Sequence, residues 1–140
     1  GRGFSRHARE KCNASQLEAV VAAVEGGDAV TLVQGPPGTG KTTTLVVAVN
    51  ALHLAQFRRY YEAIRRASRR DDDVSGRGAV ATHPGAWVER LASLRPRILV
   101  AAPSNVAVDN VVEKIVELGF VGGDGRPYSP DVVRVGPPGA

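Results

Sequence analysis

The sequence predicts an α/β fold in which helices flank a parallel sheet, and three observations support this prediction. The β-branched run 30–33 is typical of a strand buried on both faces, a glycine-rich turn over 35–40 follows it directly, and a helix opens at Lys41. Two further apolar runs, 98–102 and 132–135, have the same strand character. Strands that alternate with helices favour a parallel sheet with right-handed crossovers.

Two more helices are predicted from apolar residues at helical spacing. A capping box formed by Ser15 and Glu18 should begin the first helix, and the pair Gly26-Gly27 should end it. The second helix should cover 108–118, with Gly119 as its terminator. The apolar stripe of the first helix consists of Leu17, Val20, Val21 and Val24.

The stretch from about 57 to 97 fits this alternating plan least well, and we interpret it as a basic helical insertion within the crossover. It contains arginines at helical spacing, followed by three aspartates at 71–73. One interpretation is a solvated helix extension in which Glu62 pairs with Arg58 and Arg66. The other is a supplementary contact to nucleic acid.

Length and composition restrict the class of protein. A chain of 140 residues supports one compact domain at most, and its apolar runs are far shorter than the roughly 20 residues that cross a bilayer. The single cysteine, Cys12, cannot form an internal disulfide, which favours an intracellular location in the nucleus or cytoplasm. A net charge of +4 makes polyanions plausible partners. Because the chain starts at a glycine and has no methionine, we expect it to be part of a longer protein.

Residues 35–42 satisfy the pattern G-x-x-x-x-G-K-[ST] between a predicted strand and a predicted helix. Glycines allow successive N–H groups to turn inward around phosphate oxygens, and the helix N-terminus adds positive charge. Lys41 can place its ammonium at the β and γ phosphates, and the Thr42 hydroxyl is suited to Mg²⁺. We therefore assign Lys41 and Thr42 as catalytic residues and Thr42 as the metal ligand. The predicted nucleotide contacts are Gly35, Pro36, Pro37, Gly38, Thr39, Gly40, Lys41, Thr42 and Thr43.

Two flanking segments could decide what the nucleotide is used for. The Gln16 amide can accept from adenine N6–H and donate to N7, although Gln16 taken alone is better explained as a solvated residue in a first helical turn. Ser104 and Asn105 lie where a predicted strand turns into a helix. Their side chains and the free N–H groups there could cradle a phosphodiester backbone, or they could simply cap the helix.

The combination of these segments resembles a known family. Asn-x-Ser-Gln at 13–16, Gly-Pro-Pro-Gly-Thr-Gly-Lys-Thr at 35–42 and Ala-Pro-Ser-Asn-Val-Ala-Val-Asp at 102–109 are similar to the first RecA-like domain of superfamily 1 helicases, in the senataxin-like, nonsense-mediated-decay branch. The resemblance covers 11–56 and 97–136. It implies an ATP-dependent helicase or translocase that unwinds RNA, DNA or hybrids, with ATP and Mg²⁺ bound at the loop.

The resemblance also implies individual roles. By it, Gln16 reads adenine, while Lys41 and Thr42 handle phosphate and Mg²⁺. The residues implied to lie on the single-stranded nucleic acid track are Pro103, Ser104 and Asn105.

The chain departs from the family pattern in ways that bear on activity. Cys12 stands where the family usually has leucine. No predicted strand ends in the Asp-Glu pair that holds Mg²⁺, and no second RecA-like domain supplies arginines, so we expect an incomplete ATP-binding domain that is inactive alone. The alternative is a fragment of an AAA+ ATPase that remodels proteins. In that class the strand corresponding to 98–102 ends in Asp-Glu, whereas here Pro-Ser-Asn follows it.

Overall fold

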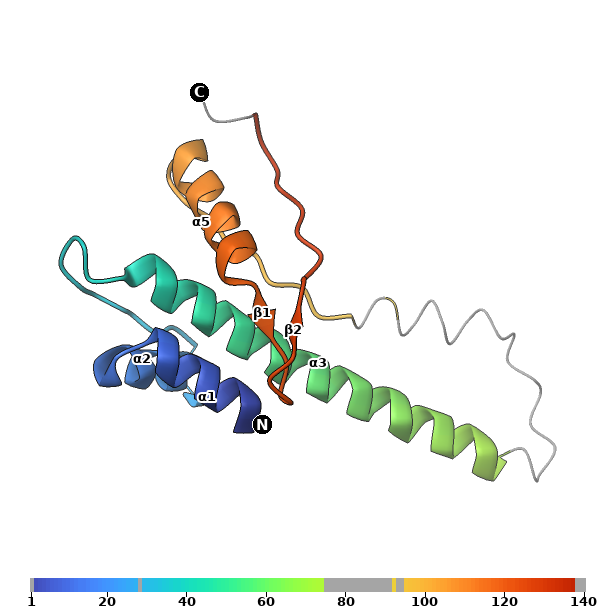
Figure 1. Cartoon of the computed structure of the whole chain (residues 1–140). Coiled ribbons are helices and arrows are strands. Elements are labelled where there is room, and N and C mark those ends of the chain that lie inside the picture. Colours follow the sequence, from blue (N-terminus) through green and yellow to red (C-terminus); the bar gives the residue numbers. More distant parts are fainter. Residues whose placement is uncertain (1, 28, 75–91, 93–94, 138–140) are drawn as a thin grey trace. The chain divides into compact units, whose positions relative to one another are not determined.

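The computed structural model describes residues 2–27, 29–74, 92 and 95–137 (Figure 1). Contacts along the chain define a main unit, Gly1–Leu54 with Ile98–Ala140, and a second unit, Ala55–Arg97. No helix in the described residues is long and apolar enough to cross a membrane. The elements in chain order are α1 (Arg2–Lys11), α2 (Ala14–Glu25), α3 (Lys41–Val74), α5 (Asn105–Leu118), β1 (Phe120–Val121) and β2 (Pro127–Tyr128). Most of the predicted insertion after Val74 lies outside the described residues.

The first turns of α3 form the centre of the main unit, because two of its faces are buried against different partners. One face packs on α1 and α2, and burial raises the pKa of the Cys12 thiol in that cluster, so Cys12 acts as a neutral packing group. The other face packs on α5 and β1. The cluster with α1 and α2 contains Ala8, Cys12, Val20, Val47 and Ala51. The cluster with α5 and β1 contains Val46, Val49, Ile115 and Phe120.

The helix predicted from Ser15 is present as α2, but a different residue pair caps it. Asn13 is the N-cap: its side-chain oxygen accepts from the Gln16 N–H at 2.9 Å, and the Gln16 side chain accepts from the Asn13 N–H at 2.8 Å. The capping box predicted at Ser15 and Glu18 is therefore wrong by two residues. Asn13–Gln16 and Ser15–Glu18 both match the four-residue capping-box pattern. The structure selects Asn13, which has the extended backbone conformation of an N-cap (φ −75°, ψ 176°) and forms the two hydrogen bonds.

The prediction of a parallel sheet is not supported by the described residues. Among them, the strand pairing present is the antiparallel pair β1–β2, with Phe120 opposite Tyr128 and Val121 opposite Pro127. The segments 30–33, 98–102 and 132–135 have no strand assignment, and large apolar side chains in them face solvent: Leu32 is 88% exposed and Leu99 is 91% exposed. A strand needs a hydrogen-bonded neighbour, and within the described structure these segments have none, although Ile98 and Val100 are half-buried against the cluster with α5 and β1.

A buried polar cluster fastens the β1–β2 hairpin to α3. Asn50 is only 2% exposed, and its side-chain amide binds both backbone polar groups of Val121. The amide oxygen accepts from the Val121 N–H at 2.9 Å, and the amide nitrogen donates to the Val121 carbonyl at 3.3 Å. The Tyr128 hydroxyl lies 2.8 Å from His53 Nδ1. Burial raises the pKa of Tyr128, so its hydroxyl stays protonated at neutral pH.

Candidate nucleotide-binding site

The glycine-rich loop links the segment 30–34 to the first turn of α3, as the sequence predicts. Two of its glycines, Gly38 (φ +77°) and Gly40 (φ +75°), have left-handed backbone conformations that other residues rarely adopt. A β-carbon on Gly38 would meet no atom within 4 Å, so its glycine requirement is set by backbone conformation. A β-carbon on Gly40 would lie 3.0 Å from the Gln16 amide nitrogen, so this position also needs space.

The side chains of the loop bind the loop itself. The Lys41 ammonium donates to the Gly35 carbonyl at 2.9 Å and to the Pro36 carbonyl at 2.6 Å, and the Thr39 hydroxyl donates to the Pro36 carbonyl at 2.7 Å. Lys41 is an exposed residue, so its ammonium is free to exchange these carbonyl oxygens for phosphate oxygens. The loop thus places an exchangeable positive charge directly beside its glycines.

The start of α3 adds backbone donors to this charge. The Thr44 N–H makes the first helical bond, to the Gly40 carbonyl at 3.0 Å, which leaves the earlier N–H groups of Lys41, Thr42 and Thr43 without a helical partner. Thr42 is exposed and Thr43 is half-buried. Backbone donors, the helix dipole, an ammonium and an exposed hydroxyl fit the chemistry of a polyphosphate with a bound Mg²⁺.

The structure brings Gln16 to this loop from α2. Its amide nitrogen donates to the Thr39 carbonyl at 2.8 Å, while its amide oxygen accepts from the Asn13 N–H. A primary amide has two hydrogens and two lone pairs, so one of each is still available in these contacts to pair with a base edge. Gln16 therefore links α2 to the glycine-rich loop in this structure. Its second amide hydrogen and its second oxygen lone pair remain available for the contacts that adenine recognition needs.

The other predicted segment lies at the N-terminus of α5. Ser104 is the N-cap, with its hydroxyl accepting from the Ala107 N–H at 3.2 Å, so the capping role left open by the sequence is present. Pro103 and Asn105 are exposed beside it. In the described residues, no hydrogen bond or ion pair joins residues 103–105 to the glycine-rich loop.

An ion pair for which the sequence contains no local signal holds the C-terminal segment beside this helix start. Arg134 donates from Nε to Asp109 Oδ1 at 2.8 Å and from Nη2 to Oδ2 at 3.2 Å, and Nη1 donates to the Gly136 carbonyl. A β-carbon on Gly136 would lie 3.3 Å from the Asn105 side-chain oxygen. Arg134 and Asp109 are 25 positions apart in the sequence, and their two parallel hydrogen bonds hold Gly136 next to Asn105.

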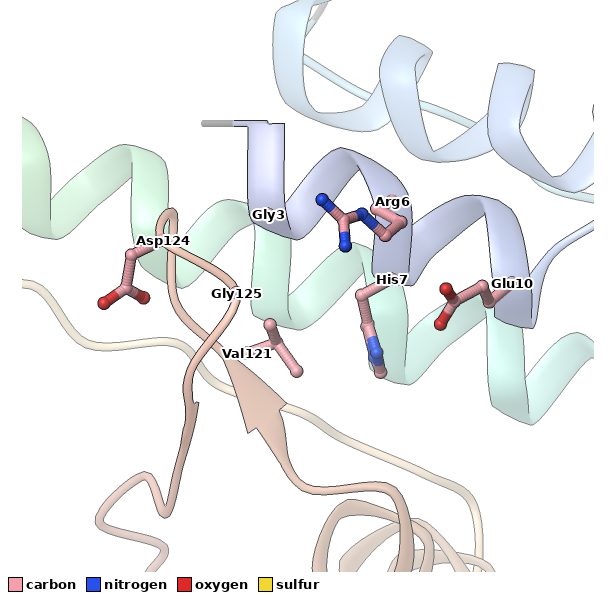
Figure 2. Close-up of a pocket in the computed structure, with 7 residues that line it drawn as sticks. All are labelled: Gly3, Arg6, His7, Glu10, Val121, Asp124 and Gly125. Atoms are coloured by element: carbon pink, nitrogen blue, oxygen red, sulfur yellow. The ribbon is translucent and has the colours of Figure 1, made fainter.

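A pocket of about 300 Å³ lies between α1 and the β1–β2 turn and contains none of the predicted site residues (Figure 2). The Gly3 N–H donates to the Gly123 carbonyl at 3.2 Å, and a β-carbon on Gly3 would overlap the backbone of Gly125. The pocket therefore marks a close helix-to-turn contact. Its walls carry charges of both signs, from Arg6, Glu10 and Asp124.

Comparison with known proteins places the chain in a family. The family model described as "AAA domain" matches residues 11–140. Helicase sen1 of Schizosaccharomyces pombe is 34% identical over 93% of this chain, and ATP-dependent helicase upf1 of the same yeast is 37% identical over 79% of it. A probable helicase of Dictyostelium discoideum is 31% identical over 89% of the chain. No solved structure matches the chain at a significant level.

A phosphate loop at a helix start and relatives of this kind define a P-loop NTPase. The chain belongs to the AAA domain family and, within the superfamily 1 helicases, to the Sen1/UPF1 branch. It spans 6%, 8% and 17% of the lengths of the sen1, upf1 and Dictyostelium relatives. The match to these helicases disfavours the alternative of a protein-remodelling AAA+ ATPase.

Proposed function

We propose that this chain is the ATP-binding part of an intracellular helicase or translocase, acting in the nucleus or cytoplasm, that couples ATP hydrolysis to movement on single-stranded RNA or DNA. The observation that carries the proposal is the hydrogen bond from Gln16 to the Thr39 carbonyl, 2.8 Å long, because it brings the amide that we propose reads adenine to the glycine-rich loop. The helicase relatives support the same function.

In this proposal each residue of the site has a distinct task. The backbone from Gly35 to Gly40 and the start of α3 hold the polyphosphate, and Lys41 leaves the Gly35 and Pro36 carbonyls to neutralise the β and γ phosphates. The Thr42 hydroxyl would be a Mg²⁺ ligand, and that ion supplies charge neutralisation when bound. The acidic Mg²⁺ partner and the arginines of a second domain would come from other parts of a longer protein. We therefore propose that the chain alone hydrolyses no ATP.

The exposed segments of the main unit fit a RecA-like sheet that is completed by other parts of the protein. Segments 30–33, 98–102 and 132–135 have strand-forming sequences, and each leaves large apolar side chains in solvent. A row of exposed valines and leucines in strand-forming sequence needs neighbouring strands to become stable. We propose that these segments are strands of a parallel sheet in the longer protein.

We expect Gln16→Ala to reduce the preference for ATP over GTP in the longer protein about tenfold, since a bidentate amide-to-adenine pair is worth roughly 1–3 kcal/mol. The measurement is competition of ATP against GTP for binding. Gln16→Glu should lose the preference as well. Its carboxylate still accepts from the Asn13 N–H, so the helix cap is kept, but it can donate neither to adenine N7 nor to the Thr39 carbonyl. Gln56→Ala, a glutamine on α3, is the matched control. Unchanged selectivity in both Gln16 variants would leave Gln16 with a structural role only.

The proposed nucleic acid contact is tested at Asn105, which is exposed and is not the helix cap. We expect Asn105→Ala to weaken binding of single-stranded oligonucleotide by about 1 kcal/mol, the value of one neutral hydrogen bond, with no change in salt dependence. Asn110→Ala, on the exposed surface of the same helix, should bind as wild type. The measurement is a fluorescence anisotropy titration of the longer protein with oligouridylate and oligothymidylate. Equal affinities for the two variants would contradict a role for Asn105 on the nucleic acid track.

A further inference from the structure

Most of the described part of the second unit is a stretch of α3 whose surface combines arginines with aromatic rings. Residues Ala55 onward continue the helix that begins at Lys41. Four arginines in this stretch are exposed: Arg58, Arg59, Arg65 and Arg66. Such a density of basic side chains on one helix surface is the electrostatic signature of a polyanion partner.

Among the described side chains, these arginines form no close ion pair with the neighbouring acid, Glu62. The sequence suggests that Glu62 pairs with Arg58 and Arg66, but within the described side chains no ion pair or hydrogen bond joins them. That prediction is wrong for this structure. Glu62 therefore does not hold the guanidinium groups of Arg58 and Arg66 in this structure, and four exposed arginines stand against this one acid over 55–66.

An aromatic cluster lies along the same stretch. The rings of Phe57, Tyr60 and Tyr61 contact one another, with centroids 6.1 Å apart for Phe57–Tyr61 and 5.5 Å apart for Tyr60–Tyr61. Phe57 and Tyr60 are half-buried, whereas Tyr61 is 55% exposed. The rings of Phe57 and Tyr60 pack against the Tyr61 ring and restrict its motion. A base that stacks on Tyr61 would therefore cost little side-chain entropy.

Helical spacing places Tyr61 between two of the arginines. Arg58, Tyr61 and Arg65 are related by three and four residues, so they follow one row along the helix surface. A braced, exposed ring flanked by two exposed guanidinium groups has the composition of a platform for single-stranded nucleic acid, in which a base stacks on the ring and the arginines meet the flanking phosphates.

We propose that Arg58, Tyr61 and Arg65 on α3 form a second contact for single-stranded nucleic acid, separate from Ser104 and Asn105. The proposal rests on the proposed function, because it assumes that the protein acts on such a strand. Charge complementarity selects the occupant: the row offers positive charge and a ring, and a phosphodiester strand offers negative charge and bases. An acidic protein segment would use the arginines but would not need the flat face of Tyr61.

The test is a titration of labelled oligouridylate with the longer protein at several salt concentrations. We expect Tyr61→Ala to lower affinity at least about fivefold, and Tyr61→Phe to restore it, because stacking needs the ring and not the hydroxyl. Arg58→Gln together with Arg65→Gln should reduce the magnitude of the salt slope by about 0.7 for each phosphate that the arginines no longer neutralise. The matched control is Arg2→Gln with Arg9→Gln, which removes the same charge from exposed positions of α1.

The outcomes separate this proposal from the proposed function. If Asn105→Ala weakens binding while the Tyr61 and Arg58/Arg65 variants match the α1 control, the α3 contact is refuted and the helicase function stands. If wild-type protein binds no oligonucleotide and shows no nucleic-acid-stimulated ATP hydrolysis, both fail. A lower salt slope with an unchanged Tyr61→Ala affinity refutes the stacking platform and leaves Arg58 and Arg65 as phosphate contacts alone. Circular dichroism of each variant checks that α3 remains helical.

Discussion

Replacing Lys41 with alanine should reduce ATP hydrolysis by the longer protein at least about 100-fold. The ammonium lies in the loop, 2.9 Å from the Gly35 carbonyl and 2.6 Å from that of Pro36, where it can transfer to phosphate oxygens. Removing one preorganised donor to a developing negative charge typically costs about 10²–10³ in rate, roughly 2.7–4 kcal/mol. The measurement is steady-state hydrolysis with saturating single-stranded nucleic acid, using the protein that contains this chain.

The control for this variant is another lysine. Lys114→Ala removes an ammonium from α5 that pairs with Glu117 at 2.8 Å, and hydrolysis should be unchanged. The melting temperature should not move for Lys41→Ala either, because Lys41 is exposed and water can replace it at the loop carbonyls. Near-normal turnover in Lys41→Ala would show that the loop does not hold the reacting phosphates.

The parts of the fold that could be predicted from the sequence are those fixed by neighbouring residues. The start of α3 follows from the glycines before Lys41, and α5 ends at Gly119 as predicted, although it begins at Asn105, three residues before the predicted start. The predicted N-cap of α2 was wrong because Asn13–Gln16 and Ser15–Glu18 both match the capping-box pattern. The local sequence alone does not show which of the two pairs caps the helix. Local signals locate a helix but can misplace its end.

The parts that could not be predicted depend on contacts between distant residues. Segments 30–33 and 98–102 have strand-forming sequences, yet a strand exists only with neighbours, and the described residues provide none. The Arg134–Asp109 pair also has no local signal, although it sets the position of Gly136 beside Asn105. The residues of the candidate nucleotide site could be named from motifs alone, whereas the tie from Gln16 to Thr39 needed the structure.

Asn50 is the clearest case of a residue whose importance the sequence hides. It lies in an otherwise apolar stretch of α3, and a polar residue there suggests an exposed position. Instead it is 2% exposed, and its side-chain amide hydrogen-bonds to both the N–H and the carbonyl of Val121, as a neighbouring strand would. The two residues are 71 positions apart in the sequence. Val121 is itself buried, so its backbone groups have no access to water if Asn50 is removed.

We therefore expect Asn50→Ala to destabilise the chain by about 3 kcal/mol, because it leaves a buried N–H and a buried carbonyl without partners. At roughly 2–4 °C per kcal/mol for a domain of this size, the melting temperature should fall by about 10 °C. Asn110→Ala makes the same change at an exposed site of α5 and should stay within about 0.5 kcal/mol of wild type. Hydrogen exchange gives a local readout, since the Val121 N–H, held at 2.9 Å by Asn50, should exchange faster in Asn50→Ala than in Asn110→Ala. If both variants melted together with wild type and the Val121 amide stayed equally protected, the hairpin would be held by the packing of Phe120 on α3, and the Asn50 amide would contribute little.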